Sequence, residues 1–283
     1  MSDDGAYGLT IIAFVGSVFS PYYAWKGRVD PLDHCAINVA LYTPNGNRWS
    51  MTERRRDAVE RSCDSLAIGP SSLRWDGGAL SIALNEIGAP IPFPLRGAVR
   101  VEPTIVNREA HLLERVGRHF WRPIAPAARV EAAFEKPALR WRGHGYFDCN
   151  AGDEPLEEAF ASWTWSRAQI EKGAAILYDA ERRREPAFSL ALSFDDAGAC
   201  EAFTPPSPAP LPRSNWRVAR AARSDDASAS LLRTLEDTPF YARSVVGTTL
   251  LGQRRAVMHE SLSLDRFANP IVRAMLPFRM PRR

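Results

Sequence analysis

The segment AINVALYTPNGNRWSMTE, residues 36–53, predicts two β-strands joined by a turn. Ala36–Tyr42 and Arg48–Glu53 are short runs rich in apolar, β-branched and aromatic side chains, a composition typical of strands. Asn45-Gly46-Asn47 lies between them and supplies residues that tolerate the backbone of a tight turn. A chain built from such pairs is expected to be all-β.

Similar runs recur along most of the 283 residues. Trp75-Asp76-Gly77-Gly78-Ala79 is a second strong hairpin signal. Helical patterning is weak: Val106–Val116 predicts a short helix, and Glu154–Phe160 predicts a turn or two. The proline-rich segment Thr204–Pro212 predicts an extended surface loop, because proline cannot donate to a sheet. Further strands are expected at Leu9–Val15, Ala79–Leu84, Ala98–Ile105, Arg129–Phe134, Leu139–Phe147, Ala161–Arg167, Ala174–Ala180, Phe188–Phe194, Trp216–Arg220, Ser244–Leu251 and Ala256–Leu264.

The length suits one large domain or two modest ones, each with its own core. Two prolines interrupt the strand pattern in Trp121–Pro126. We therefore predict a boundary near residue 126, with β domains at 1–126 and 127–283. Many short strands at close spacing are typical of antiparallel barrels or sandwiches.

The net charge of +3 is small, but arginines cluster along the chain. These clusters could attract anionic lipid headgroups or could lie in solvated loops. No basic helix or RNA-binding signature accompanies them, so nucleic acid is not an expected partner. The clusters are Arg54–Arg56, Arg182–Arg184, Arg254-Arg255 and Arg282-Arg283.

Cysteine usage and hydropathy bear on location. The four cysteines are widely spaced, which predicts free thiols in a reducing cytoplasm. The apolar run Leu9–Phe19 is too short to span a membrane and lacks a basic n-region, so it predicts a buried strand. We expect a cytoplasmic protein, soluble or peripherally attached to a membrane.

Candidate chemistry concentrates in Gly143–Asn150 and in His119-Phe120-Trp121. Alternate residues of a strand share a face, so His144, Tyr146 and Asp148 can face one cavity. His119 and Trp121 share a face for the same reason. A carboxyl group among aromatic side chains is desolvated, which raises its pKa and keeps it able to donate a proton.

Each of these residues also has a structural interpretation. Asp148 could cap the turn that follows it, since aspartate favours such positions. Tyr146 and Trp121 could pack in a core, and His119 could be a buried, hydrogen-bonded histidine. His144 lies between two glycines and could serve the backbone. Trp163, Trp165 and Arg167 share a strand face and could form a stripe of a barrel wall.

Several site types lack their signatures. The chain has no glycine-rich phosphate loop, no GxSxG and no HExxH motif. Its five histidines, at positions 34, 111, 119, 144 and 259, lack metal-ligand spacing. We therefore expect no metal and no cofactor, which leaves acid–base chemistry or simple binding.

A collinear set of motifs resembles the carotenoid 1,2-hydratase family, also called hydroxyneurosporene synthases, of purple photosynthetic bacteria. The resemblance covers nearly the whole chain. The matching motifs are GSVFSPYY at 16–23, DHCAINVALY at 33–42, MTER at 51–54, VEP at 101–103, HFWRP at 119–123, GYFDCN at 145–150 and WTWSRA at 163–168.

This resemblance implies two lipocalin-like antiparallel β-barrel domains. It also implies hydration of the terminal C1=C2 double bond of acyclic carotenes such as neurosporene, lycopene and their 1-hydroxy derivatives. The family's His-x-Trp and Tyr-x-Asp pairs fall on His119, Trp121, Tyr146 and Asp148, with the aspartate as proton donor. We further expect the substrate to contact His144, Trp141, Trp163 and Trp165.

The implied reaction suits these residues. Protonation at C2 gives a tertiary cation at C1, which water captures, so no redox cofactor is required. His119 or His144 could orient the water or accept its proton. Because a C40 polyene partitions into lipid, the resemblance also implies peripheral contact with the intracytoplasmic membrane. A non-catalytic lipocalin-like carotenoid or isoprenoid carrier and a cofactor-free cyclase are the alternatives.

Overall fold

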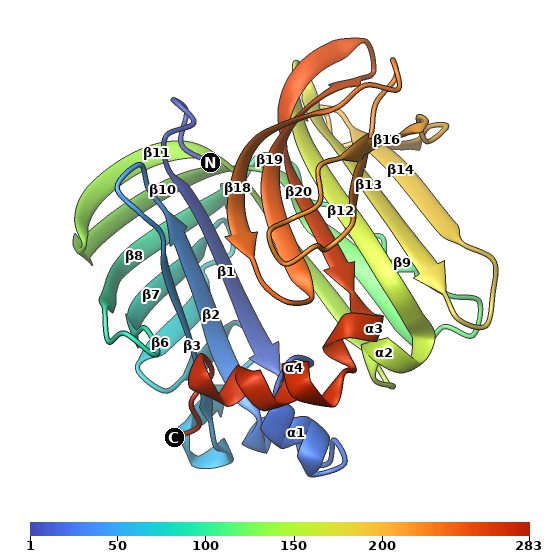
Figure 1. Ribbon diagram of the computed structural model, residues 1–283. Coiled ribbons are helices and arrows are strands. Elements are labelled where there is room, and N and C mark those ends of the chain that lie inside the picture. Colours follow the sequence, from blue (N-terminus) through green and yellow to red (C-terminus); the bar gives the residue numbers. More distant parts are fainter. The chain divides into compact units, whose positions relative to one another are not determined.

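Antiparallel sheets account for most of the computed structural model, which describes residues 1–283 (Figure 1). The chain divides into two compact units. Unit 1 comprises Met1–Pro103, Ala128–Gly145 and Arg273–Arg283, and unit 2 comprises Thr104–Ala127 and Tyr146–Val272. One change of unit, after Ala127, lies beside the domain boundary predicted near residue 126, which stays a prediction.

Unit 1 opens with a three-stranded sheet in the order β1 (Gly8–Val15), β2 (Cys35–Tyr42) and β3 (Arg48–Arg54). All eight residues of β2 are buried, because it is the central strand of this sheet. β2 and β3 pair antiparallel from Cys35 opposite Arg54 to Leu41 opposite Arg48. The hairpin predicted for residues 36–53 is therefore confirmed.

A second sheet of unit 1 is a meander whose side chains alternate between core and solvent. In β7, Leu80, Ile82, Leu84 and Glu86 are buried and the residues between them are exposed. The Asp76 carboxylate accepts the backbone N–H groups of the turn before β7, which explains the strong Asp-Gly-Gly signal. The meander strands are β4 (Val59–Arg61), β5 (Ser65–Ile68), β6 (Ser71–Trp75), β7 (Leu80–Ile87) and β8 (Pro94–Pro103).

Two long strands extend this sheet in the order β11-β10-β8. β10 (His119–Lys136) and β11 (Ala138–Gly152) each have residues in both units. The short strand β9 (His111–Leu112) pairs with Phe120 and Trp121 at the start of β10. The residues predicted to do chemistry lie at the start of β10 and the end of β11.

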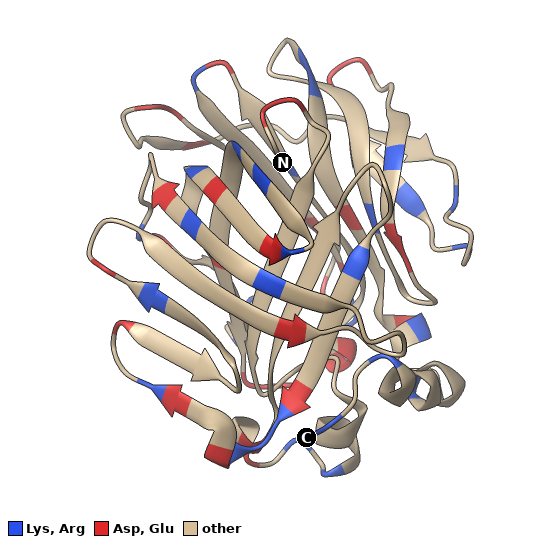
Figure 2. Ribbon diagram, turned by 90° about the vertical axis from the view of Figure 1, so that its left-hand side faces the viewer, with Lys and Arg blue, Asp and Glu red and all other residues tan.

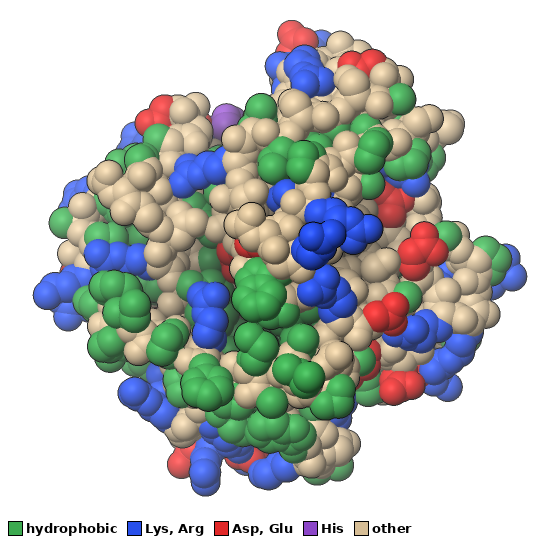
Figure 3. Space-filling view, in the orientation of Figure 1, with side chains coloured by type: hydrophobic (Ala, Val, Ile, Leu, Met, Phe, Trp, Pro, Cys, Tyr) green, Lys and Arg blue, Asp and Glu red, His purple; other side chains and the backbone are tan.

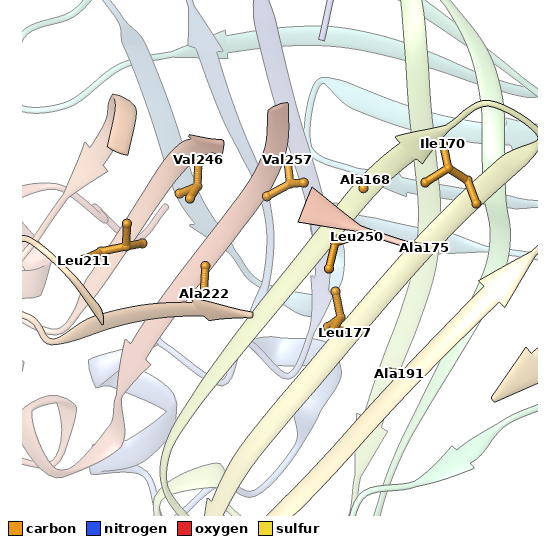
Figure 4. Packing of buried hydrophobic residues seen from close by; sticks show 10 residues of the cluster. All are labelled: Ala168, Ile170, Ala175, Leu177, Ala191, Leu211, Ala222, Val246, Leu250 and Val257. Carbon is orange, nitrogen blue, oxygen red and sulfur yellow. The ribbon is translucent and has the colours of Figure 1, made fainter. Parts of the chain in front are cut away.

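Unit 2 has a seven-stranded antiparallel sheet in the order β15-β14-β13-β12-β20-β19-β18. A two-stranded sheet, β16 (Pro208–Leu211) with β17 (Arg220–Arg223), packs its Leu211 and Ala222 into the apolar cluster on one face of the large sheet (Figure 4). The strands of the large sheet are β12 (Phe160–Ile170), β13 (Gly173–Arg182), β14 (Phe188–Phe194), β15 (Cys200–Ala202), β18 (Ser230–Asp237), β19 (Tyr241–Leu250) and β20 (Gln253–Ser263).

Helices are short. Ser20 caps α1 (Pro21–Trp25) by accepting the backbone N–H of Tyr23. The others are α2 (Leu156–Ala159), α3 (Leu264–Phe267), α4 (Pro270–Met275) and the 3₁₀ turns η1 (Pro31–Asp33), η2 (Arg56–Ala58) and η3 (Leu276–Phe278). None of the helices has the length and apolar character needed to cross a membrane.

Three local predictions were wrong. Val106–Val116 is not helical, and its only regular structure is β9. Trp216–Arg220 is mostly irregular, because the strand begins at Arg220. Part of Thr204–Pro212 is a strand, since the prolines of β16 occur in a two-stranded sheet whose Ala209 and Leu211 are buried. The helix predicted within Glu154–Phe160 is confirmed by α2, and all four cysteines are free, as expected.

Basic and acidic side chains are interspersed along the strands (Figure 2). Several clustered arginines form ion pairs within their own unit. Arg54 pairs with Glu86, Arg182 with Glu185 at 2.8 Å, and Arg183 with Asp265. These arginines stabilise the units locally.

Candidate active site

Trp121, Tyr146 and Asp148 form one hydrogen-bonded cluster in unit 2. The Trp121 indole N–H is shared between the Tyr146 hydroxyl at 3.0 Å and Asp148 Oδ2 at 2.9 Å. The Tyr146 hydroxyl also hydrogen-bonds to the Asp148 carboxyl group. Tyr146 and Asp148 are two residues apart on β11, so strand alternation places both on the face that meets Trp121.

The surroundings of Asp148 favour its neutral form. Burial raises the pKa of Asp148 to about 6, and the charge of Glu260 acts in the same direction. Hydrogen bonds from Tyr146, Trp121 and Asn150 oppose that rise, because they stabilise the carboxylate. Desolvation is the largest of these effects, so Asp148 keeps its proton up to a pH of about 6, well above the range of an ordinary aspartate.

Aromatic side chains surround this cluster. Trp121 is fully buried, and its ring lies 5.6 Å from His111 and 5.5 Å from Tyr178. Tyr146 packs against Trp165 at 5.0 Å. Burial, followed by the charge of Asp148, raises the pKa of Tyr146, which keeps its hydroxyl a hydrogen-bond donor. The acid is thus set in an aromatic environment.

Trp163 and Trp165 lie on β12, and the structure connects both to the cluster. Trp165 contacts Tyr146, while Trp163 lies 6.1 Å from the ring of Tyr178. Sequence reasoning overlooked Tyr178, although its strand was predicted. What marks Tyr178 as part of the site is its position directly opposite Trp165 on the paired strand, and the sequence alone does not show that register.

His119 is buried beside the cluster and both of its ring nitrogens have protein partners. Nδ1 lies 2.8 Å from Glu114 Oε1, and Nε2 lies 3.0 Å from the Glu154 carbonyl oxygen. Both ring nitrogens are therefore engaged by groups of the protein. Its acid–base role remains a prediction, and its visible contacts hold the turn after β11 against β10.

Glu114, His119 and Glu154 also form the set in this region that could hold a cation. Their ligand atoms lie within 4.8 Å of one another. Arg118 at 2.6 Å and Arg184 at 3.1 Å already pair with the Glu154 carboxylate. The charge of that carboxylate is thereby neutralised within the protein.

His144 and Trp141, predicted to bind substrate, belong to unit 1. His144 Nε2 lies 3.3 Å from an Arg129 guanidinium nitrogen and 3.5 Å from Asp3, and its side chain is about half exposed. The Trp141 indole N–H is buried without an acceptor. Substrate contact by either residue stays a prediction.

Comparisons with known proteins identify the family of this chain. A family model described as carotenoid hydratase CrtC matches residues 11–283. The acyclic carotenoid 1,2-hydratase of Thiocapsa roseopersicina is 55% identical over all of this chain and 71% of its own length. The Rubrivivax gelatinosus protein of that name is 48% identical with the same coverage, and the Cereibacter sphaeroides protein is 42% identical over 96% of this chain and 98% of its own.

A solved structure supports the fold. The crystal structure of CghA with Sch210972 covers 95% of this chain and 87% of its own, with a TM-score of 0.58 and 10% identity. At this identity the likeness concerns the fold alone. Together with the antiparallel sheets, it confirms the predicted all-β, lipocalin-like fold class. On the family model and the extent of these identities, the chain belongs to the carotenoid hydratase CrtC family.

Proposed function

We propose that this protein is an acyclic carotenoid 1,2-hydratase, a hydro-lyase that adds water across a terminal C1=C2 double bond. The observation that carries the mechanism is the buried Asp148, whose pKa is raised to about 6 and whose carboxyl group is aligned by Trp121 and Tyr146. Relatives named acyclic carotenoid 1,2-hydratase support the reaction and substrate class. Neurosporene, lycopene and their 1-hydroxy derivatives are the expected substrates.

Asp148 is the proposed proton donor. An alkene is a very weak base, so its acid must be neutral and well aligned before reaction. Transfer of the Asp148 proton to C2 leaves a tertiary cation at C1, and water then forms the C1–O bond. The π faces of Trp121 and Tyr146 can stabilise that cation by about 1–2 kcal/mol each in a dry site.

Incubation of the purified protein with lycopene and no added cofactor tests this function. We expect a product heavier by one molecule of water. Asp148→Asn should abolish that product while carotene binding persists, and Asp153→Asn, in the exposed turn that follows, should retain it. Binding with no new product would support a carrier, and a product of unchanged mass would support a cyclase or isomerase.

We also infer peripheral contact between unit 1 and membranes. Large apolar side chains are exposed on and after α1 and in the C-terminal segment: Trp25 at 61%, Val29 at 62% and Phe278 at 74%. The two segments are neighbours, because Arg282 pairs with Asp33 at 2.6 Å. Figure 3 shows hydrophobic side chains gathered over α4, which leads into this segment.

Flotation with liposomes of equal parts phosphatidylcholine and phosphatidylglycerol tests the membrane contact. The wild-type protein should float, and a Trp25→Ser, Phe278→Ser double variant should remain at the bottom. Ile91→Ser is the matched control, because Ile91 is 59% exposed in a different loop of unit 1. Failure of the wild-type protein to float would contradict membrane contact.

A further inference from the structure

We propose that Glu260 is the base that takes the proton from the water that captures the cation. This inference rests on the proposed hydration and assigns its second half, the step that Asp148 does not perform. It makes Glu260 a catalytic residue and Trp165 its partner in holding the water. The motif analysis does not identify Glu260.

Strand register places Glu260 in a row of directly opposed side chains across unit 2. Trp165 on β12 lies directly opposite Tyr178 on one side and Glu260 of β20 on the other. Arg243 on β19 is directly opposite Glu260, and Glu236 on β18 is opposite Arg243. Directly opposed residues of antiparallel strands share a face, so all five side chains are on one face of the sheet.

That face is the one that meets the Asp148 cluster. The Tyr146 ring packs on Trp165 at 5.0 Å, and the Trp121 ring packs on Tyr178 at 5.5 Å. Glu260 is the next residue of the row beyond Trp165. The charge of Glu260 also contributes to the raised pKa of Asp148, in agreement with this placement. An acid and a carboxylate therefore flank the same aromatic surface from different elements.

Arg243 holds Glu260 in place through one carboxylate oxygen, Oε1, and leaves the other oxygen, Oε2, without a protein donor. Arg243 is buried, and its Nε at 3.0 Å and its second guanidinium nitrogen at 2.6 Å both donate to Glu260 Oε1. Its remaining nitrogen donates to Glu236 at 2.6 Å. Glu260 Oε2 thus remains open as an acceptor, on a side chain that is 23% exposed.

An unpaired donor lies in the same row. Trp165 is 8% exposed, and its indole N–H is buried without a protein acceptor. Buried N–H groups almost always have partners, so an exception calls for an explanation. A water molecule that accepts from Trp165 and donates to Glu260 would satisfy both groups. The same water would lie against the aromatic surface where the cation forms.

The proposed hydration balances in bonds and protons. The O–H bond of Asp148 breaks, the C1=C2 π electrons form the C2–H bond, and a cation remains at C1. A water lone pair forms the C1–O bond, and one water O–H bond breaks as its proton moves to Glu260 Oε2. That proton returns through solvent to the Asp148 carboxylate. The net change is one water molecule added to the alkene.

Glu260→Gln, assayed with lycopene in D2O, tests this division of labour. We expect hydration to fall by at least about a hundredfold, a common effect of losing a general base. Because Asp148 still protonates C2, the cation should form, lose a proton and return as lycopene that carries deuterium. Asp148→Asn should give neither product nor deuterium. Glu236→Gln, which alters the other partner of Arg243, should hydrate like the wild type.

Two outcomes would overturn the proposal. One is hydration by Glu260→Gln at the rate of Glu236→Gln. The other is loss of both hydration and deuterium uptake in a folded Glu260→Gln that binds lycopene normally. Should Glu260→Gln not fold, Glu260→Asp, which keeps the carboxylate, must lose hydration more than deuterium uptake. A wild-type protein that does not hydrate lycopene would instead refute the proposed function.

Discussion

A single indole N–H organises the candidate site at the scale of residues. Trp121 donates to both Tyr146 and Asp148, so it fixes the orientation of the acid and of the phenol beside it. Trp121 is fully buried, which keeps this donor away from competing water. Asp148 does not cap a turn, because β11 continues to Gly152, and the further contact of its carboxylate is with the Asn150 side chain at 3.3 Å.

The pKa of Asp148 predicts how turnover depends on pH. Asp148 must carry its proton to react, and its pKa is raised to about 6. Turnover should therefore fall as the pH rises above about 6, approaching tenfold for each further unit. A pH–rate profile with lycopene measures this. A rate that stays constant from pH 6 to pH 9 would rule out Asp148 as the acid.

The same raised pKa predicts an effect on stability. The folded state binds the Asp148 proton more tightly than the unfolded state does, so wild-type stability falls as the pH rises from 3.8 to about 6. Asp148→Asn removes that cost, roughly 2–3 kcal/mol at neutral pH. Urea unfolding should show the variant more stable than the wild type at pH 7.5, with a smaller difference at pH 4. An equal difference at both pH values would contradict the assignment.

Trp121→Phe tests the shared donor. The hydrogen bond from Trp121 lowers the pKa of Asp148, so its loss should move the decline in activity to higher pH. The maximal rate should also fall, because the acid loses its alignment. Trp163→Phe, outside the hydrogen-bonded cluster, is the comparison. An unchanged pH profile in Trp121→Phe would show that the indole does not act on the acid.

At the scale of elements, local sequence predicted the strands well where turn chemistry bounded them. The turn at Asp76 and the hairpin around Asn45 are formed by contacts between residues that are close in sequence, so a local pattern can predict them. The helix predicted for Val106–Val116 is absent because tertiary packing overrides the local pattern: Leu113 is buried in irregular chain, while Val106 and Val116 are exposed. The strand at β20 was predicted, but its pairing with β12 was not, because the pairing joins segments far apart in sequence. Glu260 was missed for that reason.

Gly152 at the end of β11 is required by a close approach of β10. A Cβ there would lie 2.3 Å from His119 Cδ2 and 2.9 Å from the Arg118 carbonyl oxygen. Gly152→Ala should therefore cost about 1–3 kcal/mol, because backbone must move. Gly78→Ala is the control, since its nearest neighbour would be a side-chain oxygen at 3.8 Å. Equal urea midpoints for the two variants would contradict this account.

At the scale of the whole molecule, the chain is interleaved between two units. Unit 1 takes three separate segments, including the C-terminal Arg273–Arg283. Arg282 reaches the buried Glu53 and pairs with Asp33, and the backbone of Arg283 bonds to Glu53. No pattern within the last residues predicts this return, because Glu53 lies far away in sequence. Composition and turn signals therefore predicted the fold class but not the course of the chain.

Arg282→Ala should destabilise unit 1 strongly. It would leave Glu53, which is 2% exposed, without its guanidinium partner. Breaking a buried ion pair in this way costs about 3–5 kcal/mol. Urea unfolding against Arg61→Ala, an exposed arginine of β4, measures the effect. Matching midpoints would show that the C-terminal contact contributes nothing.

The measurement that tests the central claim most directly is lycopene turnover in water labelled with heavy oxygen, by wild-type protein and by Asp148→Asn. The claim is that Asp148 protonates the alkene and that solvent water then captures the cation. The wild type should yield a hydroxylated carotene that carries the label, and the variant should bind lycopene and yield none. Labelled product from Asp148→Asn at the wild-type rate, or wild-type product without the label, would contradict it.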